Sequence, residues 1–257
     1  MDTTKLKSRL GTKLQTLQEP GSDPVETETT LVSANSGYVA LNSNALEIIS
    51  ENLKNQPLSV QLFDIVKAPS GGATVFSVPG PAGDEIEKEL VGIILDYTTP
   101  RAYWESTDPV EGMPPACLSH NSITSQDGKV CAHCPYNDFG SKDGESSAKA
   151  CKESVLLFLL QPDNALPLLV RVPVSSKNRF LRYSTRLLST LTPISGVVMR
   201  ITLEKATNRA GKPYAVYNFE AIGTLSSEEA AQARTFSQQF MEVIHSSEIV
   251  PQLSEAS

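Results

Sequence analysis

Residues 154–172 of this 257-residue chain, SVLLFLLQPDNALPLLVRV, contain two apolar runs separated by a short polar segment. The runs, Ser154 to Leu160 and Leu166 to Val172, have the length and composition of buried β-strands. Between them, Gln161 to Asn164 is typical of a turn, because proline presets φ while Asp and Asn bond to their own backbone. The sequence therefore predicts a β-hairpin here.

The elements after this hairpin are predicted from their periodicity. Apolar residues recur at helical spacing from Ser176 to Leu191, and they alternate with polar residues from Val197 to Lys205. A glycine-containing loop then joins this strand to another from Tyr214 to Ile222. A final helix, Ser226 to His245, begins with the Ser-x-x-Glu spacing of a capping box.

The elements before the hairpin complete the predicted fold. A helix is expected from Ser43 to Leu53, strand-like runs from Val60 to Val66 and Ala73 to Val78, and a long strand from Leu90 to Trp104. The order strand, long insertion, strand, strand, helix, strand, strand matches a five-stranded OB barrel. We therefore expect a β-rich α+β fold, an OB-like barrel with flanking helices. A split mixed α+β sheet would contain the same elements.

Composition sets the expected domain boundaries. Residues 1–36 are rich in Thr, Ser, Glu and Pro, and we expect them to be disordered. Residues 37–245 are expected to form one OB-like domain with a zinc subdomain at 112–152, and residues 246–257 a flexible acidic tail. No apolar run approaches the roughly 20 residues of a membrane span, and the N-terminus has no apolar signal core. The sequence favours a cytoplasmic protein.

The four cysteines, Cys117, Cys131, Cys134 and Cys151, follow the spacing C-x13-C-x2-C-x16-C. In a reducing compartment, clustered cysteines indicate metal or redox chemistry before disulfides. A C-x2-C pair turns the chain so that both thiolates reach one ion at about 2.3 Å. The region between the outer cysteines has few apolar residues for a core of its own, so a metal would replace that core. We expect structural zinc held by all four.

Other interpretations of these cysteines stay open. Four thiolates also suit an iron–sulfur cluster, and Cys131 with Cys134 could act as a redox dithiol. His120 or His133 could also replace one cysteine as a ligand. No catalytic motif is present among the phosphate-binding, dinucleotide-binding and zinc-protease patterns, so we do not expect an enzyme.

Charge is distributed unevenly along the chain. The net charge is −7, yet between Arg171 and Tyr217 nine basic residues face one acidic residue, which gives +8 and leaves −15 for the rest. From Phe219 onward, six acidic residues face one arginine. Such a basic segment favours nucleic acid as a partner, although it could instead pair with the acidic regions of the same fold.

A family resemblance rests on a motif at the cysteines. The motif C-x2-C-P-x-N-x-[WF]-G-S, here Cys131 to Ser141, is followed by Lys149-Ala150-Cys151 and, after apolar strands, by Ser176 to Phe180. In these features the chain, from about Leu90 to Phe236, resembles a group of phage and prophage proteins. That group is similar to tailed-phage single-stranded DNA-binding proteins, which carry an OB barrel with a zinc-binding subdomain. Their best-known members use other ligand spacings, so only the architecture is implied.

The resemblance implies single-stranded DNA binding in phage-type DNA replication or recombination, with zinc as the cofactor. Such proteins need cations along a groove and aromatic faces for the bases. Candidates for phosphate contacts lie near the last hairpin, and candidates for stacking lie on the first and last strands, although packing in the core or rim is an alternative for each aromatic. These residues are Arg200, Lys205, Arg209 and Lys212, and Tyr97, Tyr103, Trp104, Tyr214 and Tyr217.

Two alternative functions come from the same features. A zinc-stabilised loop could be a protein-interaction module of a replication complex, and a cluster-binding chain would be an iron–sulfur regulatory protein. The acidic C-terminal region is expected to recruit replication or recombination proteins in the first hypothesis. No membrane partner is expected.

Overall fold

The structure is a computed structural model that describes residues 32–33, 37–41, 44–54, 63, 65–66, 70–80, 82–106, 113–143, 148–208 and 211–245. The predicted disordered segment at 1–36 lies outside these residues, apart from the short strand β1 (Val32–Ser33). The predicted acidic tail at 246–257 and most of the predicted strand at 60–66 also lie outside them.

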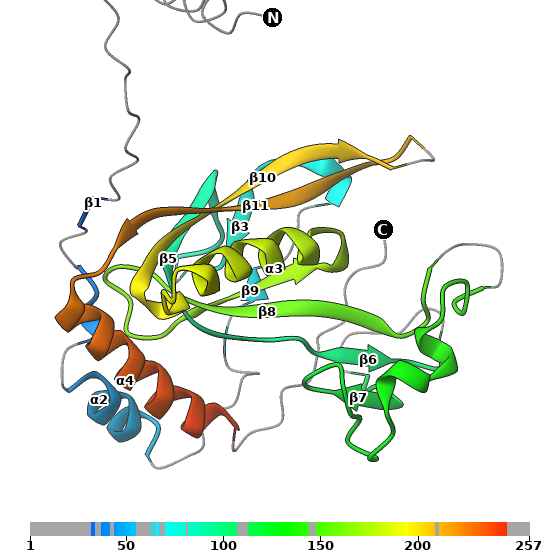
Figure 1. The fold of residues 1–257 in the computed structure, drawn as a ribbon, viewed down its shortest axis with the longest axis horizontal. Helices are drawn as coiled ribbons and strands as arrows, with labels where there is room; N and C mark the ends of the chain where they lie inside the picture. The colour runs from blue at the N-terminus through cyan, green and yellow to red at the C-terminus, as the bar shows by residue number, and fades with distance from the viewer. Residues whose placement is uncertain are drawn as a thin grey trace, which may run out of the picture. The chain divides into compact units, whose positions relative to one another are not determined.

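The described chain is an α+β fold with one large mixed sheet (Figure 1). Two of its pairs, β1 with β11 and β2 with β9, are parallel, and the others are antiparallel. A separate hairpin is formed by β3 (Phe76–Val78) and β4 (Glu85–Glu87). The strands of the large sheet are β1, β2 (Ile65–Val66), β5 (Glu89–Thr98), β6 (Arg101–Tyr103), β7 (Cys117–Ser119), β8 (Lys152–Leu160), β9 (Leu168–Pro173), β10 (Val197–Thr207) and β11 (Pro213–Thr224).

The predicted β8–β9 hairpin is confirmed, and its composition follows from burial on both sides. In β8 the side chains of Leu156, Phe158 and Leu160 enter one core, while Val155, Leu157 and Leu159 enter the other. A strand that is covered on both faces has no polar side to alternate with, so its sequence is a continuous apolar run.

The strand order expected for an OB fold is present in the pairings. β5 pairs with β8 and β10, β8 pairs with β9, and β10 pairs with β11. The helix α3 (Val174–Ser189) follows β9, as predicted. Among the described residues no pairing joins β9 to β11, so the sheet is curled but not closed there. The edge of β9 that does not face β8 pairs with β2. The helix α3 lies between the β8–β9 pair and the β10–β11 pair (Figure 1).

The long strand predicted from Leu90 to Trp104 is two strands, and this part of the prediction was wrong. Pro100 separates β5 from β6, because proline offers no N–H to a ladder. After the break β6 pairs with β7 and with the start of β8, so it leads into the cysteine region. Within β5, Gly92 allows close approach to β8, because a Cβ there would lie 2.3 Å from the carbonyl oxygen of Leu160.

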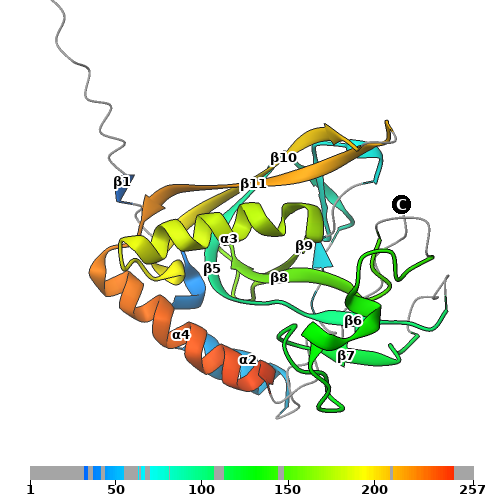
Figure 2. The same ribbon diagram turned by 45° about the vertical axis from the view of Figure 1, so that its right-hand side comes forward.

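Helices cover both faces of the sheet. On one face α3 inserts Phe180 and Tyr183 into the core. On the other face lie α4 (Ser227–His245) and α2 (Ala45–Asn52), which run side by side in Figures 1 and 2. The predicted capping box is confirmed, since the Ser226 N–H donates to Oε2 of Glu229 at 2.9 Å.

Within the described residues, no helix has both the length and the apolar content needed to cross a bilayer.

Candidate metal centre

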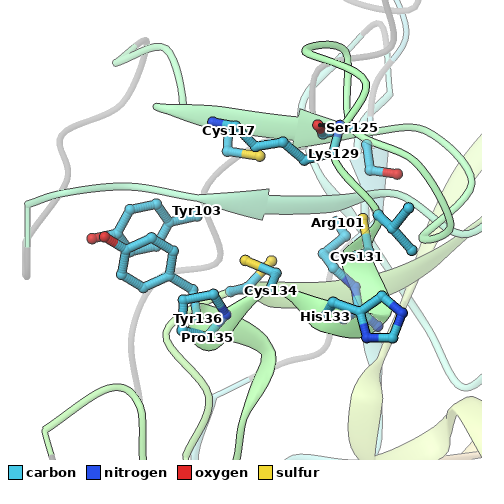
Figure 3. A pocket seen from close by; sticks show the side chains of 13 residues that line it. Arg101, Tyr103, Cys117, Ser125, Lys129, Cys131, His133, Cys134, Pro135 and Tyr136 are labelled. Carbon is cyan, nitrogen blue, oxygen red and sulfur yellow. Dashed lines mark hydrogen bonds between the residues drawn. The ribbon is translucent and has the colours of Figure 1, made fainter.

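The four cysteines come from separate segments and line one cavity. Cys117 begins β7, Cys131 begins the 3-10 helix η4 (Cys131–His133), Cys134 precedes η5 (Pro135–Asn137), and Cys151 precedes β8. The cavity has a volume of about 480 Å³, and Figure 3 shows the side chains that line it. Cys131 and Cys151 are buried, and the other two thiols are half-buried. All four cysteines therefore line the same cavity.

Polar side chains hold the first part of the cysteine loop. The Asn121 side-chain oxygen accepts the backbone N–H groups of Ile123 and Thr124 at 2.9 and 3.0 Å. The Ser119 hydroxyl donates to the Thr124 carbonyl at 2.7 Å, and the Cys131 N–H donates to the Ile123 carbonyl at 2.8 Å. The turn thus positions Cys131 through hydrogen bonds, where an ordinary loop of this length would need an apolar core.

The asparagine of the sequence motif stabilises the C-x2-C turn. The Asn137 amide donates from Nδ2 to the carbonyl of Cys131 at 3.0 Å, and its N–H donates to the carbonyl of Cys134 at 2.9 Å. Its side-chain oxygen accepts from Nζ of Lys149 at 3.0 Å. One amide therefore joins the turn to the segment that carries the last cysteine.

The serine of the motif closes the 16-residue spacing before Cys151. The Ser141 hydroxyl donates to the carbonyl of Tyr136 at 2.9 Å and accepts the N–H of Ala150 at 2.9 Å. The Cys151 N–H donates to the same Tyr136 carbonyl at 2.8 Å. Gly140, with φ of 85°, provides the left-handed backbone that this return requires. These contacts bring Cys151 to the C-x2-C turn.

Burial favours the protonated form of two of the thiols. It raises the pKa of Cys117, and it raises the pKa of Cys151 to about 12, although the charge of Arg101 acts in the opposite direction on Cys151. A metal would have to displace these protons, and the binding energy would then become folding energy. Among the described residues, no three Cys, His, Asp or Glu side chains stand close enough to hold an ion as they are placed.

Arg101 is a buried cation beside the thiols. Its side chain lines the cavity and is 8% exposed, and Nη2 binds Oε2 of Glu153 at 2.8 Å. Among the described residues, Nε and Nη1 have no hydrogen-bond partner. A four-thiolate zinc centre carries a net charge of −2, and its sulfur atoms accept N–H donors. The donor set and the buried guanidinium therefore fit such a centre.

The two histidines near the cysteines lie in different surroundings. His133 lines the cavity, but its side chain is exposed, and all four thiols are present beside it (Figure 3). His120 is not among the residues that line the cavity, and its Nε2 lies 3.3 Å from Nε2 of Gln126. Four cysteines and one of the two histidines therefore line the cavity.

The predicted phosphate contacts lie in different surroundings. Arg200 is paired, with Nε at 3.2 Å from Glu89 and Nη1 at 3.4 Å from Glu220, so acidic neighbours offset its charge. Lys205 at the end of β10 and Lys212 before β11 are exposed. Arg209 lies outside the described residues. The hairpin between β10 and β11 therefore presents two lysines to solvent.

The predicted stacking residues separate into buried and accessible rings. Tyr217 is fully buried in the core, and Tyr97 is half-buried with its ring centre 4.8 Å from that of Phe180. Tyr214 is 36% exposed beside the β10–β11 hairpin. The rings of Tyr217 and Tyr97 therefore serve packing, and the ring of Tyr214 remains accessible.

The two adjacent aromatics at the end of β6 line different cavities. Tyr103 lines the cysteine cavity and stacks on Tyr136, with ring centres 3.9 Å apart and an angle of 11°. Trp104 lines a second cavity of about 520 Å³, and its Nε1–H donates to the carbonyl of Met113 at 3.0 Å. The end of β6 therefore contributes one aromatic side chain to each of the two cavities.

Sequence reasoning missed the other residues of this second cavity. Phe139 and Lys149 come from the cysteine loop, while Lys152 and Lys177 come from β8 and α3. The signal in the sequence was the aromatic position of the motif, occupied here by Phe139, together with the lysines on both sides of Cys151.

Comparisons with protein-family models, with curated proteins and with solved structures find no match for the chain.

Proposed function

We propose that this chain binds single-stranded DNA in phage-type replication or recombination, through an OB-like sheet whose cysteine loop is held by structural zinc. The strand order carries the proposal. The pairings of β5, β8, β9, β10 and β11, with α3 between β9 and β10 in the chain, are those of an OB barrel without its β9–β11 closure. This architecture uses the loops after its first and fourth strands to bind oligonucleotides.

Those two loops are the elaborated parts of this chain. The loop after the first strand is the cysteine region, and the loop after the fourth is the β10–β11 hairpin with Lys205, Lys212 and the accessible Tyr214. Exposed lysines beside an accessible ring supply the charge and the stacking surface that sequence-tolerant binding needs. A cytoplasmic location, as the sequence favours, is part of the proposal.

The four cysteines would hold the zinc, which would cross-link three segments of the loop and add the stability that a small apolar core cannot supply. Four cysteine ligands would leave no position on the zinc for a reacting water. This agrees with a binding protein and not with a hydrolase. Elemental analysis and a visible spectrum test the metal, because one zinc per colourless chain excludes an iron–sulfur cluster.

Fluorescence anisotropy with labelled oligonucleotides, single-stranded and double-stranded, at two salt concentrations tests the DNA-binding proposal. We expect a preference for single strands and an affinity that falls steeply with salt. No binding to the single strand at low salt would overturn the proposal.

Lys212→Ala tests the hairpin in the same assay. We expect about a 2- to 5-fold loss of affinity and a salt slope that decreases by about 0.7, the value for one phosphate contact on a single strand. Arg186→Ala removes another exposed cation, from the last turn of α3, and it is the matched control. If both variants lose the same affinity, the hairpin is not part of the site.

A protein-interaction module is the second candidate, and exposed apolar side chains on the cysteine loop favour it. Ile123 is 65% exposed and Val130 49% exposed, on the two paired arms of one turn. A zinc-loaded chain that binds no oligonucleotide at low salt would favour this function. The acidic C-terminal region, the expected contact to replication proteins, lies outside the described residues.

A further inference from the structure

A groove beside the cysteine cavity combines cations with one exposed and one half-buried aromatic ring. It has a volume of about 520 Å³, within the roughly 300–1,000 Å³ of small-molecule sites. It lies where the end of β6, the start of β8, the end of β9 and the start of α3 meet the cysteine loop. Cys151 lines both this groove and the cysteine cavity.

The lining of the groove is strongly basic for a chain of net charge −7. Four lining residues are cations, and one, Glu153, is an anion, which gives +3. Glu153 is already engaged by Arg101 and Lys177. The cations are Lys149, Lys152, Arg171 and Lys177.

Three of the cations, Lys149, Arg171 and Lys177, are half-buried, and Lys152 is exposed. Burial lowers the pKa of Arg171 to about 10, so this side chain is still cationic at neutral pH. The Nζ of Lys152 donates to the carbonyl of Lys149 at 3.1 Å. A partly desolvated cation gains from an anionic ligand, because the ligand replaces the lost hydration.

Two aromatic rings stand next to these cations. Phe139 is 79% exposed, which leaves most of a large apolar ring in water. Nζ of Lys149 lies 4.5 Å from the centre of that ring, within cation–π distance. Trp104 lines the same groove. Rings beside ammonium groups are the combination that takes a base and its phosphate together.

We propose that this groove binds one nucleotide unit of the single-stranded DNA, with the base stacked on Phe139 beside Trp104 and the phosphate held by Lys149, Lys152 and Lys177. The inference rests on the proposed function and deepens it. It gives the cysteine loop a direct part in binding, because Phe139 and Lys149 belong to that loop. An acidic peptide would use the cations alone, whereas a nucleotide uses both features.

Trp104 is the only tryptophan of the chain, so its fluorescence reports on this groove alone. We expect oligothymidylate to quench this fluorescence over the same concentration range in which anisotropy detects binding. Phe139→Ala should weaken binding roughly 5- to 150-fold, the range for one lost base–aromatic stack. Phe139→Tyr should restore it, since the ring face is kept.

Leu191→Ala is the matched control, because Leu191 is 92% exposed and lies beyond the far end of α3. Binding in anisotropy with unchanged Trp104 fluorescence, and with Phe139→Ala equal to Leu191→Ala, overturns the groove and leaves the DNA-binding function in place. Absence of binding in both measurements removes the function itself. Quenching by an oligoglutamate peptide and not by the oligonucleotide also overturns the proposal.

Discussion

Replacing Glu153 by Gln should destabilise the fold, because this carboxylate joins three elements. It lies on β8, and it binds Arg101 of β6 at 2.8 Å and Lys177 of α3. The side chains are 13%, 9% and 23% exposed in that order. Burial alone would raise the pKa of the Glu153 carboxyl, but hydrogen bonds and charges from Lys177 and Arg101 outweigh it, so the pKa ends below its ordinary value.

The size of the effect follows from the burial of the partners. Removing one member of a buried ion pair typically costs about 3–5 kcal/mol, because a desolvated charge is left behind. We expect about 3 kcal/mol, the lower end, since the glutamine carbonyl still accepts one hydrogen bond and Lys177 can turn towards water. For a chain of this size, about 2–4 °C per kcal/mol converts this to a melting temperature roughly 6–12 °C lower.

The effect has a defined pH dependence. A carboxyl whose pKa is lowered in the folded state adds stability above its unfolded pKa, about 4.5, and this stability is lost as the pH falls through the folded value. The difference in unfolding free energy between wild type and Glu153→Gln should therefore be complete at pH 7. It should shrink once the pH falls below about 4.5.

Thermal and urea unfolding, followed by circular dichroism at pH 7 and at acidic pH, measure this difference. Glu89→Gln is the control, because Glu89 pairs with Arg200 in a half-exposed ion pair, with side chains 48% and 37% exposed. Such a pair contributes only about 0–1 kcal/mol. A Glu153→Gln melting temperature within about 2 °C of wild type, or equal to that of Glu89→Gln, would refute the reasoning.

Two further predictions concern the metal centre. Cys131→Ser should reduce the zinc content per chain and lower the melting temperature, because the centre would lose one of four ligands; unchanged stability in a zinc-free variant would count against a structural metal. Arg101→Lys should weaken zinc binding about 10- to 100-fold in a chelator competition, since Nε and Nη1 are the donors available to thiolates. Equal affinity of the two proteins for zinc would exclude that role of the guanidinium.

The sheet could be predicted where the composition of a strand indicates how its two faces are covered. The run from Val155 to Leu160 is apolar at every position, which is compatible with a strand covered on both faces, and the structure covers it so. The short strands β4 and β7 could not be predicted in this way, because three residues have no measurable periodicity and depend on a partner strand. The break at Pro100 had a local signal, since proline cannot donate to a ladder.

The same limit applies to the site. Contacts between residues near each other in the chain could be predicted, and contacts between distant segments could not. The clustering of the four cysteines within 35 residues, with Cys131 and Cys134 in one C-x2-C turn, predicts a shared location, and all four line one cavity. Burial of Tyr217 could not be predicted, because an aromatic in an alternating strand has the same pattern whether its face meets solvent or α3. Arg101 and Glu153 belong to separate strands, and only the pairing of β6 with β8 brings them together.

The cysteine loop and the sheet form one surface. Cys151 lines the metal cavity and the basic groove, and Lys152, directly after it, is the first residue of β8. Glu153, the next residue, joins the strand to β6 and α3. Any ion held by the thiols would therefore fix the end of β8 from which a groove lysine extends. Such a metal would take no part in chemistry. It would still determine the affinity of the groove for its ligand, because the positions of the groove lysines depend on the position of Cys151.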